Sequence, residues 1–135
     1  MITGGCRCGA VRYEAEVTDP GRHGLCHCED CRRSNGAPAV AWLAVPEETF
    51  RITKGEPTLW KGTGGALRFF CGTCGTGLYY LNREVIPGIA DIQTGTLDDP
   101  GAYAPAAQIQ VAERLDWMKD LADIPEFERF PGGVV

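Results

Sequence analysis

The sequence lacks any run of 18 consecutive apolar residues, and residues 1–5 lack the basic segment and apolar stretch that open a secretory leader. The first absence argues against a membrane-spanning helix, and the second argues against export. Internal repeats, low-complexity tracts and long linkers are also missing, and 135 residues is the usual size of one domain. We therefore expect a cytoplasmic protein with no membrane association, in which residues 1–135 form a single domain.

Basic residues are outnumbered by acidic ones. The chain has 13 Lys and Arg against 18 Asp and Glu, a formal net charge of -5 at pH 7 with every thiol counted as neutral. Such a surface repels a phosphate backbone, so we expect a small-molecule partner and no nucleic acid. The sequence leaves open whether the chain forms a homodimer.

Segments that favour a helix are scarce. With 18 glycines and 9 prolines, the composition favours many short strands over long helices. Only two segments predict helices. Residues 29–35 are followed by Gly36 as a C-terminal stop, and residues 116–122 lie just before Pro125.

Strand patterns are common. Residues 11–17 alternate apolar and polar side chains, and a turn is predicted at residues 19–21. Residues 39–45 are nearly all apolar and end at Pro46, which predicts a central strand. An antiparallel meander of shorter strands is predicted over residues 50–53, 58–61, 67–70 and 78–81.

The cysteine count disfavours disulfide pairing. Seven is an odd number, and a reducing compartment keeps thiols free for metal. Structural zinc sites use four protein ligands, whereas catalytic sites use three and keep one position open. Seven divides into four and three, so we predict two zinc ions per chain. The cysteines lie in three clusters: Cys6 and Cys8; Cys26, Cys28 and Cys31; and Cys71 and Cys74.

The first and last clusters together supply four ligands. In an extended chain residues two apart point to the same side, so Cys6 and Cys8 can face one ion. Cys71 and Cys74 lie in a hairpin tip between two predicted strands, where Gly72 and Gly75 permit positive φ angles. We predict a structural zinc that joins the start of the chain to this tip.

The middle cluster offers three thiolates within six residues. His27 lies between Cys26 and Cys28 and therefore points to the opposite side of an extended backbone, away from a shared metal. We expect a zinc held by Cys26, Cys28 and Cys31 with one exchangeable position, which suits activation of a substrate thiol. A second structural zinc, completed by a distant side chain, is the alternative.

Other side chains near the triad could bind substrate. Arg32 and Arg33 directly follow Cys31, and their planar guanidinium groups suit a substrate carboxylate, although adjacent arginines are also typical of a solvated helix face. His27 is a candidate for a hydrogen-bonding role beside the metal ligands. Asp91, Asp98 and Asp99 are candidates for polar contacts near the site, although residues 97–100 are equally typical of a turn or a helix start, and that interpretation is preferred. Six aromatic residues lie in predicted strands, and we expect most of them in the core and one or two in a pocket wall. They are Trp42, Trp60, Phe69, Phe70, Tyr79 and Tyr80.

Three segments resemble the glutathione-dependent formaldehyde-activating enzyme family. They are residues 5–11 (GCRCGAV), 26–36 (CHCEDCRRSNG) and 70–76 (FCGTCGT). Residues 95–100 and 117–127 are also similar to the family, so the resemblance spans nearly the whole chain. Three cysteine clusters in this order and spacing are a strong signal.

The resemblance implies a mainly β, zinc-binding fold known as a β-tent, with short antiparallel coiled sheets, a zinc knuckle and few short helices. It also implies a structural zinc on Cys6, Cys8, Cys71 and Cys74 and a catalytic zinc on Cys26, Cys28 and Cys31. The family reaction adds glutathione reversibly to formaldehyde and is grouped with carbon–sulfur lyases. The sequence thus predicts a zinc-dependent lyase that acts on glutathione or a similar thiol and on formaldehyde or another small aldehyde.

Two functions of other classes remain as alternatives. The first is a non-catalytic, zinc-stabilised binding or chaperone-like module, because one fold can carry several functions. The second is a thiol-based redox enzyme, which requires at least one cysteine free of metal. The triad without an evident local fourth ligand favours the enzyme with an open metal site.

Overall fold

A computed structural model describes residues 1–19 and 22–133, in which ten strands form two sheets. In the three-stranded sheet the order is β1 (Ile2–Gly5), β2 (Arg12–Ala15) and β5 (Arg51–Lys54). In the seven-stranded sheet the order is β10 (Ala107–Ile109), β3 (His23–Cys26), β4 (Val40–Pro46), β9 (Ile89–Gln93), β8 (Gly77–Leu81), β7 (Leu67–Phe70) and β6 (Thr58–Lys61). All neighbouring strands are antiparallel except β10, which runs parallel to β3.

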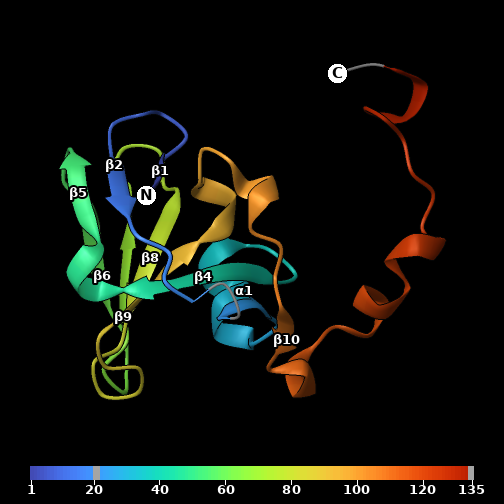
Figure 1. The fold of residues 1–135 in the computed structure, drawn as a ribbon. Helices are drawn as coiled ribbons and strands as arrows, with labels where there is room; N and C mark the ends of the chain where they lie inside the picture. The colour runs from blue at the N-terminus through green and yellow to red at the C-terminus, as the bar shows by residue number, and fades with distance from the viewer. Residues whose placement is uncertain (20–21, 134–135) are drawn as a thin grey trace.

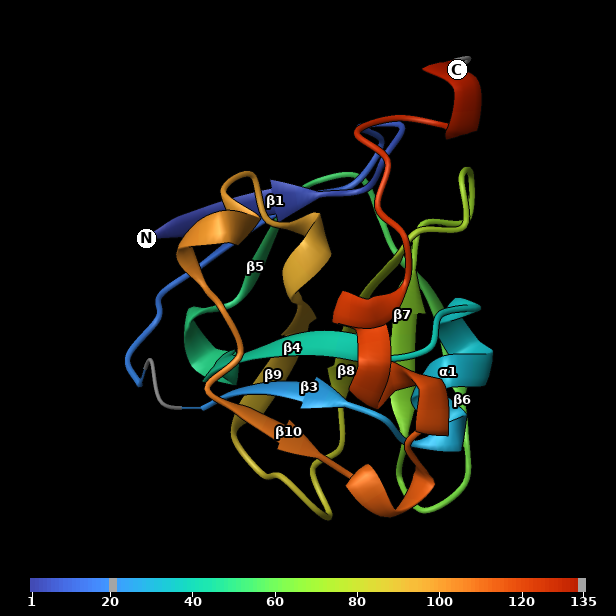
Figure 2. The same ribbon diagram turned by 90° about the vertical axis from the view of Figure 1, so that its right-hand side faces the viewer.

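Helical segments are short (Figures 1 and 2). The α-helix α1 spans Glu29–Asn35 and links β3 to β4. Six 3-10 segments occur in the described residues: η1 (Glu47–Thr49), η2 (Thr94–Thr96), η3 (Pro100–Ala102), η4 (Val111–Glu113), η5 (Asp116–Asp123) and η6 (Pro131–Gly133). None of the described helices is long and apolar enough to cross a bilayer. The mainly β class predicted from the sequence is confirmed.

The core lies between the two sheets. Val11, Tyr13 and Ala15 from the β2 side pack against Leu43 of β4 and Ile92 of β9, all at most 2% exposed. The alternation predicted for residues 11–17 is therefore confirmed, and burial of these side chains supplies the apolar stabilisation of the fold.

The opposite face of the seven-stranded sheet is different in character. Because side chains alternate along a strand, Trp42 lies on the face opposite Leu43, and Arg68 lies opposite Leu67 and Phe69. A second buried cluster on this side contains Trp42 with Cys26 and Cys31. This face therefore carries aromatic, charged and sulphur-bearing side chains, and α1 lies beside it (Figure 2).

The predicted meander is only partly right. Strands β6, β7, β8 and β9 are consecutive neighbours, as a meander requires, but β5 pairs with β2 in the other sheet. The sharp break is at residues 55–57, where Gly55 has a φ of 73°. An alanine Cβ at this position would also clash with the Ala10 backbone carbonyl. The strands β1, β3, β9 and β10 were not predicted, and Pro20 and Gly21 of the predicted turn lie outside the described residues.

The helix at residues 29–35 is confirmed. Gly36 adopts a left-handed conformation with φ of 61° and donates its N–H to the Arg32 carbonyl, as a C-terminal stop does. Cys71 and Cys74 lie in the tip between β7 and β8, as predicted, but only Gly75 of the two glycines there has a positive φ, 80°. At Gly72 a side chain is disfavoured for a different reason, because its Cβ would lie too close to the Thr58 side chain.

The C-terminal part runs away from the two sheets (Figure 1). The predicted helix at residues 116–122 is a 3-10 segment, η5, interrupted at Asp120 by a non-helical φ of −117°. Large apolar side chains along this part are about half exposed: Trp117, Leu121, Ile124, Phe127 and Phe130.

Candidate metal centres and adjoining cavity

The first cysteine group lies where the start of the chain meets the β7–β8 hairpin. The sulphur atoms of Cys6, Cys8, Cys71 and Cys74 all lie within 4.8 Å of one another. The Cys6–Cys8 and Cys8–Cys71 sulphur distances are 3.6 Å and 3.8 Å. Tetrahedral zinc, with Zn–S bonds of about 2.3 Å, holds sulphur ligands roughly 3.8 Å apart. The four side chains therefore have the spacing of a closed zinc site.

The surroundings favour the thiolate form of Cys6 and Cys74, whose pKa values are lowered. The Ala10 backbone hydrogen bond would lower the pKa of Cys8, but the neighbouring thiols, that of Cys6 foremost, together with desolvation outweigh it and raise that pKa to about 11. The Val11 N–H donates to Cys6 Sγ over 3.2 Å, and the Cys74 N–H lies 3.5 Å from Cys71 Sγ. A hydrogen bond with the Thr76 side chain is the main cause that lowers the pKa of Cys74 to about 5. Since the thiolate is the form that binds metal, this environment prepares the group for an ion.

The second group lies at the junction of β3 and α1. Cys26 ends β3, Cys28 is the N-cap of α1, and Cys31 lies in the first turn. Their sulphurs also lie within 4.8 Å of one another, and no fourth Cys, His, Asp or Glu among residues 1–19 and 22–133 joins them. The Cys31 N–H donates to Cys28 Sγ over 3.1 Å. Local chain geometry thus gathers three sulphurs, and all seven cysteines are free of disulfides.

The triad is mostly shielded from solvent. Cys26 and Cys31 are 5% and 6% exposed and pack with Val40 and Trp42, whereas Cys28 is more accessible. The hydrogen bond between the two buried thiols, with sulphurs 3.6 Å apart, lowers the pKa of Cys26 and raises that of Cys31. Three thiols this close cannot all ionise without a compensating cation, and this requirement also fits a bound Zn²⁺.

His27 is buried on another side of the backbone. Its Nε2 lies 2.8 Å from Gln108 Oε1, and its backbone N–H donates to the Ile109 carbonyl over 3.1 Å. The side chain is completely buried and is absent from the triad's ligand group, in agreement with the strand argument. His27 and Gln108 thus connect the triad loop to β10.

Arg68 is the main site residue that was not predicted from the sequence. It lies on β7, with its side chain only 11% exposed, and Nη2 lies 2.6 Å from Asp30 Oδ2 and 3.8 Å from Cys31 Sγ. The guanidinium carbon lies 6.0 Å from the Trp42 ring centre and 5.0 Å from that of Tyr80. Cation–π attraction and the ion pair therefore hold a positive charge beside the triad.

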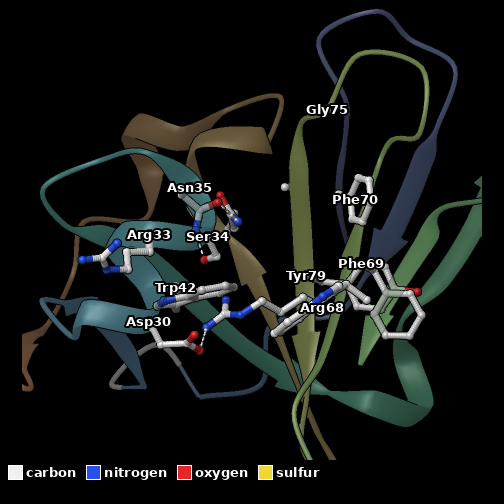
Figure 3. A pocket seen from close by; sticks show the side chains of 13 residues that line it. Asp30, Arg33, Ser34, Asn35, Trp42, Arg68, Phe69, Phe70, Gly75 and Tyr79 are labelled. Carbon is white, nitrogen blue, oxygen red and sulfur yellow. Dashed lines mark hydrogen bonds and ion pairs between the residues drawn. The ribbon is translucent and has the colours of Figure 1, made fainter. Parts of the chain in front are cut away.

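A cavity of about 500 Å³ lies next to this arginine. Figure 3 shows α1 on one side and β7 and β8 on the other, with the Arg68 guanidinium reaching past Trp42 toward Asp30. Ser34, Asn35 and Gln93 add polar groups to the wall. Of the six aromatic residues noted in the sequence, one or two were expected in a pocket wall, but five line the cavity: Trp42, Trp60, Phe69, Phe70 and Tyr79. A largely apolar wall with a few polar groups is typical of a small-molecule site.

The two arginines of α1 lie apart from the triad sulphurs. Arg33 Nε binds Glu29 Oε1 over 2.9 Å, its side chain is 79% exposed, and Figure 3 shows its guanidinium directed away from Arg68. Arg32 lines a separate hollow with Leu115 and Trp117. Of the arginines in the described part of the chain, Arg68 is the one that contacts a triad sulphur.

The comparison with known families agrees with these sites. The model of the family described as glutathione-dependent formaldehyde-activating enzyme matches residues 1–113, which include all seven cysteines and Arg68. The chain belongs to this family.

The chain is also similar to two other known proteins. An uncharacterized lyase from Schizosaccharomyces pombe is 31% identical over 115 residues, covering 74% of this chain and 82% of the relative. A crystal structure of a Rhodobacter sphaeroides protein matches with a TM-score of 0.64 and 26% identity, over 78% of this chain and 98% of the other. The family and the lyase-named relative together indicate an enzyme of lyase type, and both cysteine groups can bind metal.

Proposed function

We propose that the protein is a zinc-dependent enzyme that adds a thiol, glutathione or a similar molecule, to formaldehyde or another small aldehyde. The observation that carries this proposal is the triad of Cys26, Cys28 and Cys31, which gathers three sulphurs beside a cavity of substrate size. Family membership supports the same chemistry. In the reverse direction the reaction is the cleavage of a carbon–sulfur bond, as in a lyase.

The reaction needs no oxidant or reductant. The substrate thiol loses its proton to solvent, and its sulphur donates an electron pair to the carbonyl carbon to form the carbon–sulfur bond. The carbonyl π electrons move to oxygen, which takes up a proton from solvent. A zinc ion held by the triad would supply Lewis acidity that keeps the substrate sulphur as a thiolate.

Arg68 supports this chemistry by its charge. Three thiolates and one Zn²⁺ carry a net charge of −1, and a substrate thiolate would make the site more negative. The Arg68 guanidinium, fixed beside Cys31 in a mostly buried position, opposes this charge where screening by water is weak. We propose that Arg68 is a positioning residue that favours an anionic sulphur ligand.

The cavity would bind the part of the substrate that lies beyond its sulphur atom. Trp42 packs against the triad and also lines the cavity, so a ligand resting on its ring lies next to the metal ligands. Asn35 and Gln93, joined by a hydrogen bond from Gln93 Nε2 to Asn35 Oδ1 over 2.5 Å, offer polar groups to the ligand. Holding thiol and aldehyde together lowers the entropic cost of their reaction.

Three further assignments complete the proposal. Cys6, Cys8, Cys71 and Cys74 hold a structural zinc that clasps β7 and β8 to the start of the chain, which gives two zinc ions per chain. Of Arg32 and Arg33, Arg33 lines the larger cavity and is the one that would bind a substrate carboxylate, whereas Arg32 faces the separate hollow. His27 contributes a hydrogen bond near the site. The exposed guanidinium of Arg33 is free to move only after its ion pair with Glu29 breaks.

The test compares catalysis by matched cysteine variants. Exchange between free and glutathione-bound formaldehyde is measured by NMR at equilibrium, because the uncatalysed addition is slow enough to give a baseline. The wild-type protein should raise the exchange rate, and Cys28→Ser should return it to that baseline while retaining one zinc and its circular dichroism spectrum. A wild-type rate equal to the baseline would favour the non-catalytic binding module instead.

A further inference from the structure

Asp91 is a carboxylate in an unusual place. It lies on β9, the middle strand of the seven-stranded sheet, and faces the same side as Ala44 and Tyr80, its neighbours in register. Among residues 1–19 and 22–133 it makes no hydrogen bond or ion pair. Acidic residues are disfavoured in strands, and burying an unpaired carboxylate is costly. Asp91 is half-buried, so its unpaired charge is only partly hydrated and destabilises the fold to that extent.

The electrostatic setting of Asp91 leaves its charge only partly compensated. Burial raises its pKa to about 6, and the charge of Arg22 opposes this shift without forming an ion pair. A group with this pKa is still mainly ionised at pH 7. A cation placed against it would remove the cost of burying the charge.

A second cavity, of about 300 Å³, gives a ligand access to this carboxylate. Ile86, Ile89 and Ile109 supply an apolar wall beside Asp91, and Trp42 supplies an aromatic face. Arg22 and His23 also line this cavity, so an ammonium group would have to bind on the side of Asp91 that faces Trp42. An unpaired carboxylate together with an indole ring is a suitable environment for an ammonium group, because both attract a cation.

The second cavity adjoins the triad. Trp42 lines both cavities and packs against Cys26 and Cys31. In register, Arg68 pairs with Tyr80, and Tyr80 pairs with Asp91. Two strand spacings therefore separate Arg68 from Asp91, roughly 10 Å between backbones. The triad is farther away, because Cys26 pairs with Val40 whereas Asp91 pairs with Ala44, four residues along β4 and on its other side, roughly 16 Å between backbones. A substrate sulphur bound beyond the cysteine side chains would lie part of the way along this distance, and an extended peptide thiol would span the remainder.

We infer that Asp91 is an ammonium-binding subsite for a thiol substrate whose sulphur lies at the triad. The inference rests on the proposed function and narrows its substrate class to thiols that carry a primary ammonium group several bonds from the sulphur. Glutathione belongs to this class through its γ-glutamyl ammonium group. The Asp91 carboxylate accepts hydrogen bonds from the ammonium group, and Trp42 covers it.

The experiment uses two peptides that differ only in the ammonium group: glutathione and glutaryl-Cys-Gly, in which hydrogen replaces that group. Calorimetry measures the binding of both to the zinc-loaded protein. Wild type should bind glutathione about tenfold more tightly, and Asp91→Asn should bind the two equally. Asp99→Asn, an exposed carboxylate outside both cavities, serves as the matched control and should keep the wild-type preference.

The outcomes separate the inference from the function. If wild type binds both peptides equally, or if Asp91→Asn retains the tenfold preference, Asp91 is not the ammonium subsite, although the thiol chemistry stands. If neither peptide binds wild type, the proposed function is wrong and the subsite falls with it. Asparagine has the size of aspartate, so the variant should remain folded.

Discussion

Arg68 Nη2 lies 3.8 Å from Cys31 Sγ, although 37 positions separate the two residues in the sequence. Arg68 belongs to β7, which leads directly into Cys71 of the four-cysteine group, whereas Cys31 belongs to the triad. One short strand therefore contributes to both candidate metal centres. The hairpin of β7 and β8, which carries two cysteines of the first group, thus also carries the positive charge beside the second group.

Replacing Arg68 tests whether its positive charge favours binding of the substrate thiol. Arg68→Met keeps much of the aliphatic stem but removes the charge that faces Cys31. We expect the Michaelis constant for the thiol to rise about 10- to 100-fold, in keeping with the loss of a charge-assisted contact, and kcat to change less. Arg68→Lys should recover part of the loss, because it restores the charge without the planar fork. Steady-state kinetics with varied thiol measure both effects.

A matched control is available on the other sheet. Arg51 also forms an ion pair with a carboxylate, that of Glu14, but does so on β5 and far more exposed to solvent. Arg51→Met should leave the kinetic constants of the thiol unchanged. Equal effects of the two substitutions, or a fall in kcat alone for Arg68→Met, would contradict the role assigned to Arg68.

Gly77 is predicted to be essential to the shape of the larger cavity. An alanine Cβ there would approach Asn35 Oδ1 to 2.7 Å and would also clash with the Gln93 side chain. Gly77→Ala should break the hydrogen bond that joins α1 to β9 and lower the free energy of unfolding by about 2 kcal/mol. Gly95→Ala, where the Cβ meets nothing within 4 Å, should cost less than about 1 kcal/mol in the same denaturant titration. Equal losses would refute the steric argument.

The raised pKa of Asp91 makes stability depend on pH. The folded state holds this proton up to about pH 6, whereas the carboxyl of an unfolded chain loses it near its ordinary value of 3.8. The folded state thus binds more protons between these values, so stability falls as pH rises through this window. Asp91→Asn should remove about 2 kcal/mol of that fall, allowing for partial exposure of the group.

Denaturant unfolding at several pH values checks this prediction. The stability gained by Asp91→Asn over wild type should grow from pH 4 to pH 6 and then stay constant above pH 7. Asp99→Asn should give a curve parallel to wild type. Parallel curves for Asp91→Asn and wild type from pH 4 to pH 7 would show that Asp91 has an ordinary pKa.

The two cysteine groups should differ in their effect on folding. Cys74→Ser removes a ligand that joins the hairpin to the chain start, so we expect the loss of one zinc and a decrease of more than about 3 kcal/mol in unfolding free energy. Cys28→Ser should also lose one zinc but remain closer to wild type in stability, because α1 and β3 are adjacent in sequence. Native mass spectrometry gives the zinc count, and equal destabilisation would argue for two structural sites.

Much of the fold follows from local patterns. The alternation that buries Val11, Tyr13 and Ala15 is visible in the sequence, as is the left-handed stop at Gly36. The pairing of strands is harder to predict from the sequence, because it depends on contacts between residues that are distant in the chain. The strand at Arg51–Lys54 has the composition of a meander strand, yet Gly55 breaks the chain direction and lets it pair with β2.

The candidate site was likewise only partly predictable from the sequence. Ligand spacing alone separated four cysteines from three, and the structure gathers their sulphurs into the same two sets. Arg68 was missed because nothing near it in sequence suggests a site. One available signal was its place between the apolar Leu67 and Phe69, since alternation puts it on the face opposite the core. That this face also carries the triad depends on the order of strands in the sheet.

The most direct test of the central claim is whether a thiol enters the coordination of the metal held by Cys26, Cys28 and Cys31. The protein is prepared with cobalt in this site, and its sulphur-to-cobalt charge-transfer absorption is recorded as glutathione is added. We expect the band to grow to saturation in wild type and to remain unchanged in Cys28→Ser. An unchanged band in fully loaded wild type at saturating glutathione would contradict the account.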